Sequence, residues 1–162
     1  MTASHDVENA LHDATEELKR VEHQVYVSLK YTRTVDVLMN IISRMIEGYD
    51  KMFLAMLQHA LDQRRIGEIP SAPLIVGNQI KELYADELIQ QNVDLYFLLR
   101  KLQRSNPSRE QEFRRHVTMR TVVEGREEIV NIDIATEYYH MQRDFLNHLY
   151  KYFSVMPPPA RE

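Results

Sequence analysis

The chain has 162 residues, of which 44% are hydrophobic and 27% charged, enough to bury the core of one globular domain. It contains no cysteine, which excludes disulfides and thiolate metal sites, and no apolar run approaches the roughly 20 residues that span a bilayer. The net charge of −4 argues against a general nucleic-acid binder, and the acidic first residues, which lack an apolar signal core, favour a cytoplasmic protein.

Two long amphipathic helices are predicted in the first 65 residues. The first begins near Ser4 or Asp6, either of which is a good N-cap, and carries an apolar residue every three or four positions up to residue 29. Thr32 or Thr34 caps the second helix, which runs to about residue 65. Helices of this length are stabilised mainly by packing, so we expect each to lie against partner helices.

A loop is predicted over residues 66–78, which hold two prolines and two glycines. We expect its apolar residues 74–76 to anchor it to the core. A third helical region follows over residues 78–104, with a break near Asp86, and Asn106-Pro107 ends it.

Ser108 is expected to begin a short helix, "SREQEFRRH", with Gln111 as a capping-box partner. Residues 117–132 are rich in β-branched side chains around a Glu-Gly pair, which indicates a small hairpin or an extended loop. Asp133 is predicted to cap the last helix. Its expected core stripe is Ile134, Tyr138, Met141, Phe145, Leu149 and Tyr152.

Together these elements predict an all-α fold, an antiparallel bundle of four to five helices with, at most, a small hairpin before the last helix. We expect one domain over residues 1–156 and a flexible tail over residues 157–162, "PPPARE".

Basic residues concentrate in one part of this acidic chain. Residues 100–126 hold eight basic and three acidic side chains, a local charge of +5 in a chain of net charge −4. A basic zone on an acidic protein can form an anion-binding face. The residues we expect on that face are Arg104, Arg114, Arg115 and Arg120.

Within that segment, "REQEFRRH" places Arg109 and His116 seven residues apart. On a helix this spacing returns to nearly the same face after two turns. An imidazole can donate or accept a proton near neutral pH, and a guanidinium can hold a phosphate and its developing charge. Arg109 and His116 are therefore the candidate catalytic pair for metal-independent RNA cleavage.

Two further motifs are weaker. In "RDFLNH", Arg143 and His148 lie about 140° apart around a helix, so within one straight helix they cannot converge on a phosphate. In "EYYH", Glu137 and His140 have the spacing of di-iron bundles, but such sites need a second pair and two more inward glutamates. We therefore predict no metal and no cofactor.

The order of elements resembles the higher eukaryote and prokaryote nucleotide-binding (HEPN) domain superfamily over most of the chain. Two long helices lead, a third follows a loop, and an arginine–histidine segment precedes the last helix, "IDIATEYYHMQRDFLNHLYKYF". The resemblance implies a helical bundle that forms a homodimer. Active members cleave RNA across the dimer interface, whereas others bind ligands or partner a nucleotidyltransferase. Arg109, Glu110 and His116 match the motif by position, with Glu110 in place of the usual asparagine, aspartate or histidine.

Three functions follow, in order of preference. The first is a nucleotide- or RNA-binding module with little or no catalysis, because the Glu110 carboxylate would repel phosphate. The second is a ligand-free helical interaction or scaffold protein, in which the basic segment pairs only with its acidic surroundings. The third is a metal-independent ribonuclease that uses Arg109 and His116.

Overall fold

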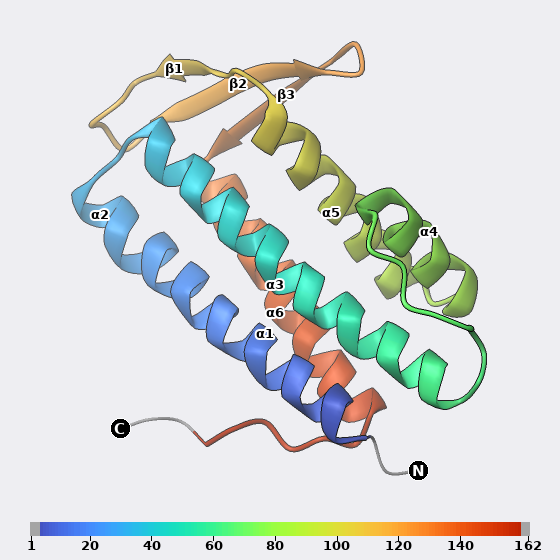
Figure 1. Cartoon of the computed structure of the whole chain (residues 1–162). Helices are drawn as coiled ribbons and strands as arrows, with labels where there is room; N and C mark the ends of the chain where they lie inside the picture. The colour runs from blue at the N-terminus through green and yellow to red at the C-terminus, as the bar shows by residue number, and fades with distance from the viewer. Residues whose placement is uncertain (1–3, 160–162) are drawn as a thin grey trace.

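The computed structural model describes residues 4–159 of the chain. It is mainly helical, with one small sheet (Figure 1). The elements are α1 (His5–His23), a π-helical turn η1 (Gln24–Ser28), α2 (Leu29–Tyr31), α3 (Val35–Asp62), α4 (Pro73–Leu83), α5 (Glu87–Arg104), β1 (Ser108–Glu110), β2 (Thr118–Val123), β3 (Arg126–Asn131) and α6 (Ile132–Tyr152).

Helix α3 is the centre of the bundle. It lies between α1 and α5 in Figure 1, with α6 packed behind them, and α4 covers part of α3 and α5. The sheet lies across the end of the bundle where α3 begins and α5 ends. The expectation that the first two long helices lie against partner helices is confirmed, because α1 and α3 form the most extensive helix pair.

The middle of the core is aromatic. Tyr49 and Phe53 of α3 stack at 5.4 Å between ring centroids, and both contact Tyr96 of α5 and Phe145 of α6. The Tyr49 hydroxyl donates to Oδ1 of Asn92 at 2.6 Å, and both residues are fully buried. Burial raises the pKa of Tyr49, so the phenol stays neutral and the pair joins α3 to α5 without a buried charge.

Helix α6 approaches α3 closely at Gly48. The Nε2 atom of Gln142, which is fully buried, donates to the Met45 carbonyl at 2.7 Å and occupies the space where a side chain on Gly48 would begin. The predicted core stripe of α6 is therefore partly wrong. Phe145 and Leu149 are buried as expected, but the other buried positions are Ala135, Tyr139, Gln142, Leu146 and Tyr150.

The all-α prediction is wrong, because the chain forms a three-stranded antiparallel sheet in the order β1-β2-β3. The expected hairpin over residues 117–132 is present as β2 and β3, joined at Glu124 and Gly125, whose φ angles are both positive as a tight hairpin turn requires. Met119 lies opposite Val130 in this pair, and both side chains are buried against the helices.

Strand β1 replaces the helix expected from Ser108. Arg109 pairs with Met119 of β2, and Gln111 and Phe113 then adopt positive φ angles of 54° and 66°. Two left-handed residues in three positions cannot continue an α-helix. Pairing with β2 therefore overrides the helical preference of this Glu-, Gln- and Arg-rich stretch.

The predicted helix starts are mostly confirmed. Ser4, Thr34 and Asp86 cap α1, α3 and α5 through side-chain oxygens that accept backbone N–H bonds, and Asp86 marks the expected break. The cap of α6 is Asn131, whose Oδ1 accepts from the Ile134 N–H at 2.8 Å, rather than Asp133.

The expected loop over residues 66–78 is shorter than predicted, because α4 already begins at Pro73. Only Val76 of the three expected anchors packs against the core. Leu74 and Ile75 are 63% and 58% exposed, so their role as anchors is wrong.

After α6 the chain turns back toward α1, and the Met156 carbonyl lies 3.1 Å from Nε2 of His12. The predicted tail over residues 157–162 falls partly outside the described residues, which end at 159. None of the helices described over residues 4–159 is both long and apolar enough to cross a membrane.

Candidate nucleic-acid interface

Arg109 is held by two carboxylates. Its Nη2 donates to Oδ1 of Asp36 at 2.7 Å, and its Nη1 donates to Oε1 of Glu112 at 3.2 Å. The same Glu112 oxygen accepts the Val35 N–H at the start of α3. The hydrogen bond and charge of Arg109 lower the pKa of Asp36. Arg109 therefore fastens the end of β1 to α3, and its guanidinium faces carboxylates that oppose a phosphate.

Arg120 and Arg115 also have acidic partners. On the outer face of the sheet Arg120 bonds to Glu110 of β1 at 3.1 Å and to Glu127 of β3, which links all three strands. The pKa of Glu110 is lowered by hydrogen bonds from Ser108 and Arg120. Arg115 donates to Oδ1 of Asp133 at 2.8 Å, across to the first turn of α6.

The two remaining arginines of the predicted basic face and the candidate catalytic histidine have unpaired side chains within the described residues. The side chains of Arg104, Arg114 and His116 make no hydrogen bond or ion pair within residues 4–159. Arg114 and His116 are exposed in the β1–β2 connection, and Arg104 ends α5. The two-turn helical relation predicted for Arg109 and His116 is wrong, since one lies in a strand and the other in the connection after it.

Phe113 is the most unusual residue of the β1–β2 connection. Its side chain is 76% exposed, although its φ of 66° is a conformation that aromatic residues seldom adopt. The Phe113 N–H donates to the Arg33 carbonyl at 2.5 Å, which holds the connection against the turn between α2 and α3 (Figure 1). An exposed aromatic side chain on a strained backbone fixed by a remote contact suggests a functional role.

The segment that accepts this hydrogen bond, α2 and the turn after it, also carries an exposed aromatic ring next to cations. Tyr31 is 79% exposed, and Lys30 and Arg33 flank it. The Phe113–Arg33 hydrogen bond thus joins two segments, distant in sequence, that each carry cations and an exposed aromatic ring. We call this the aromatic–basic surface, and its residues are Lys30, Tyr31, Arg33, Phe113, Arg114, Arg115 and His116.

Arg114, Arg115 and His116 were predicted from the sequence, whereas the aromatic rings and the contribution of the α2–α3 turn were not. A signal was present in the sequence. Phe113 stands alone among charged residues in "REQEFRRH", and Tyr31 stands between cations in "LKYTR". Aromatic residues interleaved with cations are typical of single-strand binding surfaces.

The two weaker motifs take part in ordinary contacts. Arg143 pairs with the neighbouring Asp144, and His148 lies 3.8 Å from Oδ2 of Asp86. His140 shares a 2.7 Å hydrogen bond with the Tyr26 hydroxyl. Over residues 4–159 no group of three or more His, Asp or Glu side chains is arranged to hold a metal ion.

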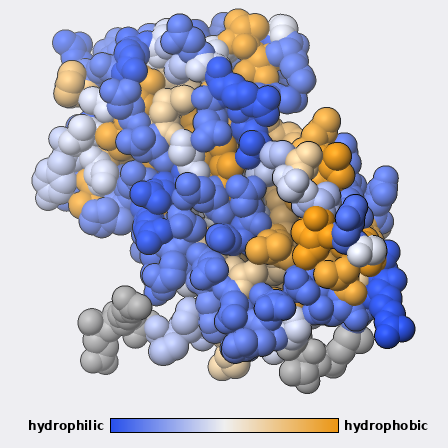
Figure 2. Space-filling model, in the orientation of Figure 1, coloured by the Kyte–Doolittle hydropathy of each residue, from blue (hydrophilic) through white to orange (hydrophobic). Residues whose placement is uncertain are grey.

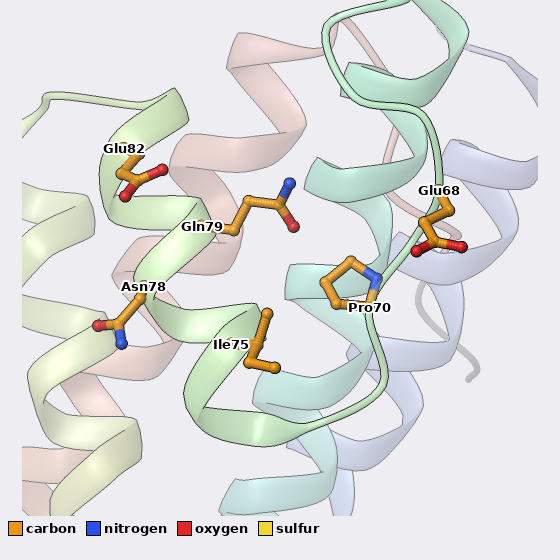
Figure 3. Close-up of a pocket in the computed structure, with 6 residues that line it drawn as sticks. All are labelled: Glu68, Pro70, Ile75, Asn78, Gln79 and Glu82. Carbon is orange, nitrogen blue, oxygen red and sulfur yellow. The ribbon is translucent and has the colours of Figure 1, made fainter.

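A second surface combines exposed apolar side chains with a mainly polar recess. Figure 2 shows hydrophobic side chains gathered over α4 and the loop that leads into it, where Leu74 and Ile75 are exposed. A recess of about 420 Å³ lies between this loop and α4. In Figure 3, Ile75 and Gln79 point from α4 toward Glu68 and Pro70 of the loop. We call this the α4 surface.

Comparison of the chain with models of known protein families, with curated proteins and with solved structures gives no match.

Proposed function

We propose that this protein binds single-stranded RNA on the aromatic–basic surface and does not cleave it. The observation that carries the proposal is the pair of exposed rings, Tyr31 and Phe113, on two segments that one hydrogen bond joins. Among the cations of these segments, Lys30 and Arg114 have no side-chain partner within residues 4–159. Bases stack on such rings whatever their sequence, and Lys or Arg side chains neutralise the phosphates between them.

The contacts of Arg109 favour binding over catalysis. A phosphate at this guanidinium would have to displace Asp36 and Glu112, and Glu112 also bonds to the start of α3. His116 therefore lacks a free Arg109 as its partner in charge stabilisation. Metal-independent cleavage by Arg109 and His116, the HEPN resemblance, the homodimer and the nucleotidyltransferase partner stay predictions.

The test is fluorescence anisotropy of labelled single-stranded RNA with the wild type and with Phe113→Ala, Tyr31→Ala and Arg114→Ala. Loss of one stacked base should weaken binding by roughly 5- to 150-fold. Loss of one phosphate contact should reduce the slope of log K against log salt by about 0.7. Phe113→Tyr, which keeps a ring, should retain most of the affinity.

Arg143→Ala is the control, because Arg143 is an exposed arginine of α6 that does not belong to this surface. It should leave RNA binding unchanged. Salt-sensitive binding that falls as much in Arg143→Ala as in Phe113→Ala and Arg114→Ala would refute the proposed surface. Absence of binding by the wild type at low salt would refute the function itself, and cleavage of the RNA lost in His116→Ala would refute its non-catalytic character.

The α4 surface favours a second candidate, a helical interaction protein whose partner is another copy of this chain. Leu74 and Ile75 expose apolar area that an identical patch on a second copy could cover around a two-fold axis. Light scattering after size exclusion should then give a dimer mass for the wild type and a monomer mass for Leu74→Ser/Ile75→Ser. Val122→Ser, which alters an exposed apolar residue of the hairpin, should stay dimeric. A monomeric wild type at high concentration would rule this candidate out.

A further inference from the structure

A pocket of about 260 Å³ opens beside the aromatic–basic surface, between the η1–α2 segment and the first turns of α6. Three cations of that surface, Lys30, Arg33 and Arg115, line it. The Nε atom of Arg33 donates to the Leu29 carbonyl, which orients the side chain, while its Nη atoms have no partner within the described residues. The pocket therefore gathers positive charge from two separate segments.

The rest of the lining is mixed. Val25, Leu29 and Ile132 form an apolar wall. Tyr26 and Thr136 also line the pocket, and their hydroxyl groups are hydrogen-bonded to His140 and to the Ile132 carbonyl. Ligand pockets combine an apolar lining with a few polar groups in this way. An apolar wall next to converging cations suits a ligand that carries both a flat ring and a phosphate.

We propose that this pocket binds the phosphorylated end of an RNA strand. The terminal nucleotide enters with its base against the apolar wall, and its phosphate meets Lys30, Arg33 and Arg115. The inference rests on the proposed RNA binding and adds the part of the strand that is recognised. The end of a strand can place one terminal nucleotide in the pocket, whereas an internal nucleotide would require the strand to bend into the pocket and out again.

The charge of the pocket also favours an end. A terminal phosphomonoester carries about −1.5 to −2 charges near neutral pH, against about −1 for an internal phosphodiester. Three cations in one pocket therefore gain more from a terminal phosphate than from an internal one. Arg115 lines the pocket and lies two positions after Phe113, so the β1–β2 connection contributes to both the pocket and the aromatic–basic surface.

One carboxylate competes with the ligand. Asp133 lines the pocket and pairs with Arg115, but the two side chains are 74% and 50% exposed, and such a pair is weak and easily displaced. Asn131, not Asp133, caps α6, so Asp133→Asn leaves the start of the helix intact. Asp133→Asn should therefore tighten binding of the phosphorylated end, whereas Arg115→Ala should weaken it. If the Arg115–Asp133 ion pair had only a structural role, the two variants would not change the affinity for the phosphorylated end in opposite directions.

The experiment uses one RNA sequence with an internal fluorophore in three forms, with a 5′-phosphate, with a 3′-phosphate, or with hydroxyls at both ends. Dissociation constants are measured for the wild type, Arg33→Ala, Arg115→Ala, Asp133→Asn and the control Arg143→Ala. One phosphorylated form should bind the wild type and the control about tenfold more tightly than the hydroxyl form. Arg33→Ala and Arg115→Ala should abolish this ratio, and Asp133→Asn should increase it.

The outcomes separate the two proposals. Equal affinity for all three RNAs, with binding still lost in Phe113→Ala, overturns the end recognition and leaves RNA binding in place. Competition by inorganic phosphate as strong as by a nucleoside monophosphate overturns the role of the apolar wall. Binding of a nucleoside monophosphate without binding of any RNA overturns both proposals in their stated form.

Discussion

The buried hydrogen bond between Tyr49 and Asn92 should contribute measurably to stability. Tyr49→Phe keeps the ring and its stacking on Phe53 but removes the hydroxyl that donates to Asn92 Oδ1 at 2.6 Å. Because both residues are fully buried, water cannot replace the lost donor. An unsatisfied buried acceptor costs about 1–3 kcal/mol. In a chain of this length each kcal/mol lowers Tm by about 2–4 °C.

Urea unfolding of Tyr49→Phe, Asn92→Leu and the double variant measures this interaction directly. Asn92→Leu leaves the Tyr49 hydroxyl without an acceptor, but the double variant leaves neither group unsatisfied. The double variant should therefore lose less free energy of unfolding than the sum of the single variants, by about 0.5–3 kcal/mol. Tyr31→Phe, at an exposed ring, is the control and should change stability by less than about 0.5 kcal/mol. Additive losses, or a loss in Tyr49→Phe no larger than in this control, would refute the reasoning.

Two further predictions concern stability. Gly77→Ala places a Cβ atom 2.5 Å from Cε1 of Phe97, so overpacking should outweigh the gain in helix propensity and lower the free energy of unfolding by about 1–2 kcal/mol in a urea titration. Gly67→Ala, which has open space around it, is the control and should change the free energy of unfolding by less than about 0.5 kcal/mol. Burial lowers the pKa of His59 below its usual 6.5, so the unfolded state takes up the proton more readily and stability falls as pH drops below about 6.5. His59→Leu should reduce that fall between pH 7.5 and pH 5.5, and an unchanged fall would exclude His59 as its cause.

Helix starts were predictable from the sequence because they depend on local chemistry. Ser4, Thr34 and Asp86 each accept a backbone N–H from within the next three residues, so a window of four residues contains the whole interaction. The cap of α6 was misplaced by two positions because Asn131 and Asp133 are both good caps. The choice between them depends on where β3 stops pairing, which the local sequence does not specify.

The orientation of α6 was harder to predict. The spacing of large apolar residues predicts which face is buried, but the buried face also depends on which side chains fit the space that the neighbouring helix leaves. Met141 and Tyr152 belong to a regular apolar stripe, yet both are exposed. The helix turns Gln142 toward α3 instead, since Gly48 leaves room there for an amide that bonds to the Met45 carbonyl. This close approach joins two helices about a hundred residues apart, so periodicity within α6 alone could not predict it.

Strand β1 and the connection after it were also beyond local prediction. The stretch from Ser108 favours a helix by composition, and its strand exists only because β2 supplies a partner. The position of Phe113 depends on the carbonyl of Arg33, eighty positions earlier in the chain. The sequence could therefore indicate a basic segment, but not that three of the seven residues of the surface come from α2 and the turn after it.

The ion pairs of the basic segment and its free cations have separate roles in shaping the candidate site. Arg109 joins β1 to α3, and Arg120 joins the three strands, so both guanidinium groups are already ion-paired with carboxylates of the protein. That fastening fixes both ends of the connection between β1 and β2 and keeps its middle exposed. Phe113, Arg114 and His116 lie exposed between these two ends, and fixing the ends reduces the entropy lost when a ligand binds. The ion pairs of Arg109 and Arg120 therefore do not by themselves favour a ligand-free protein. These pairs fix the two strands between which the unpaired Arg114 and His116 lie.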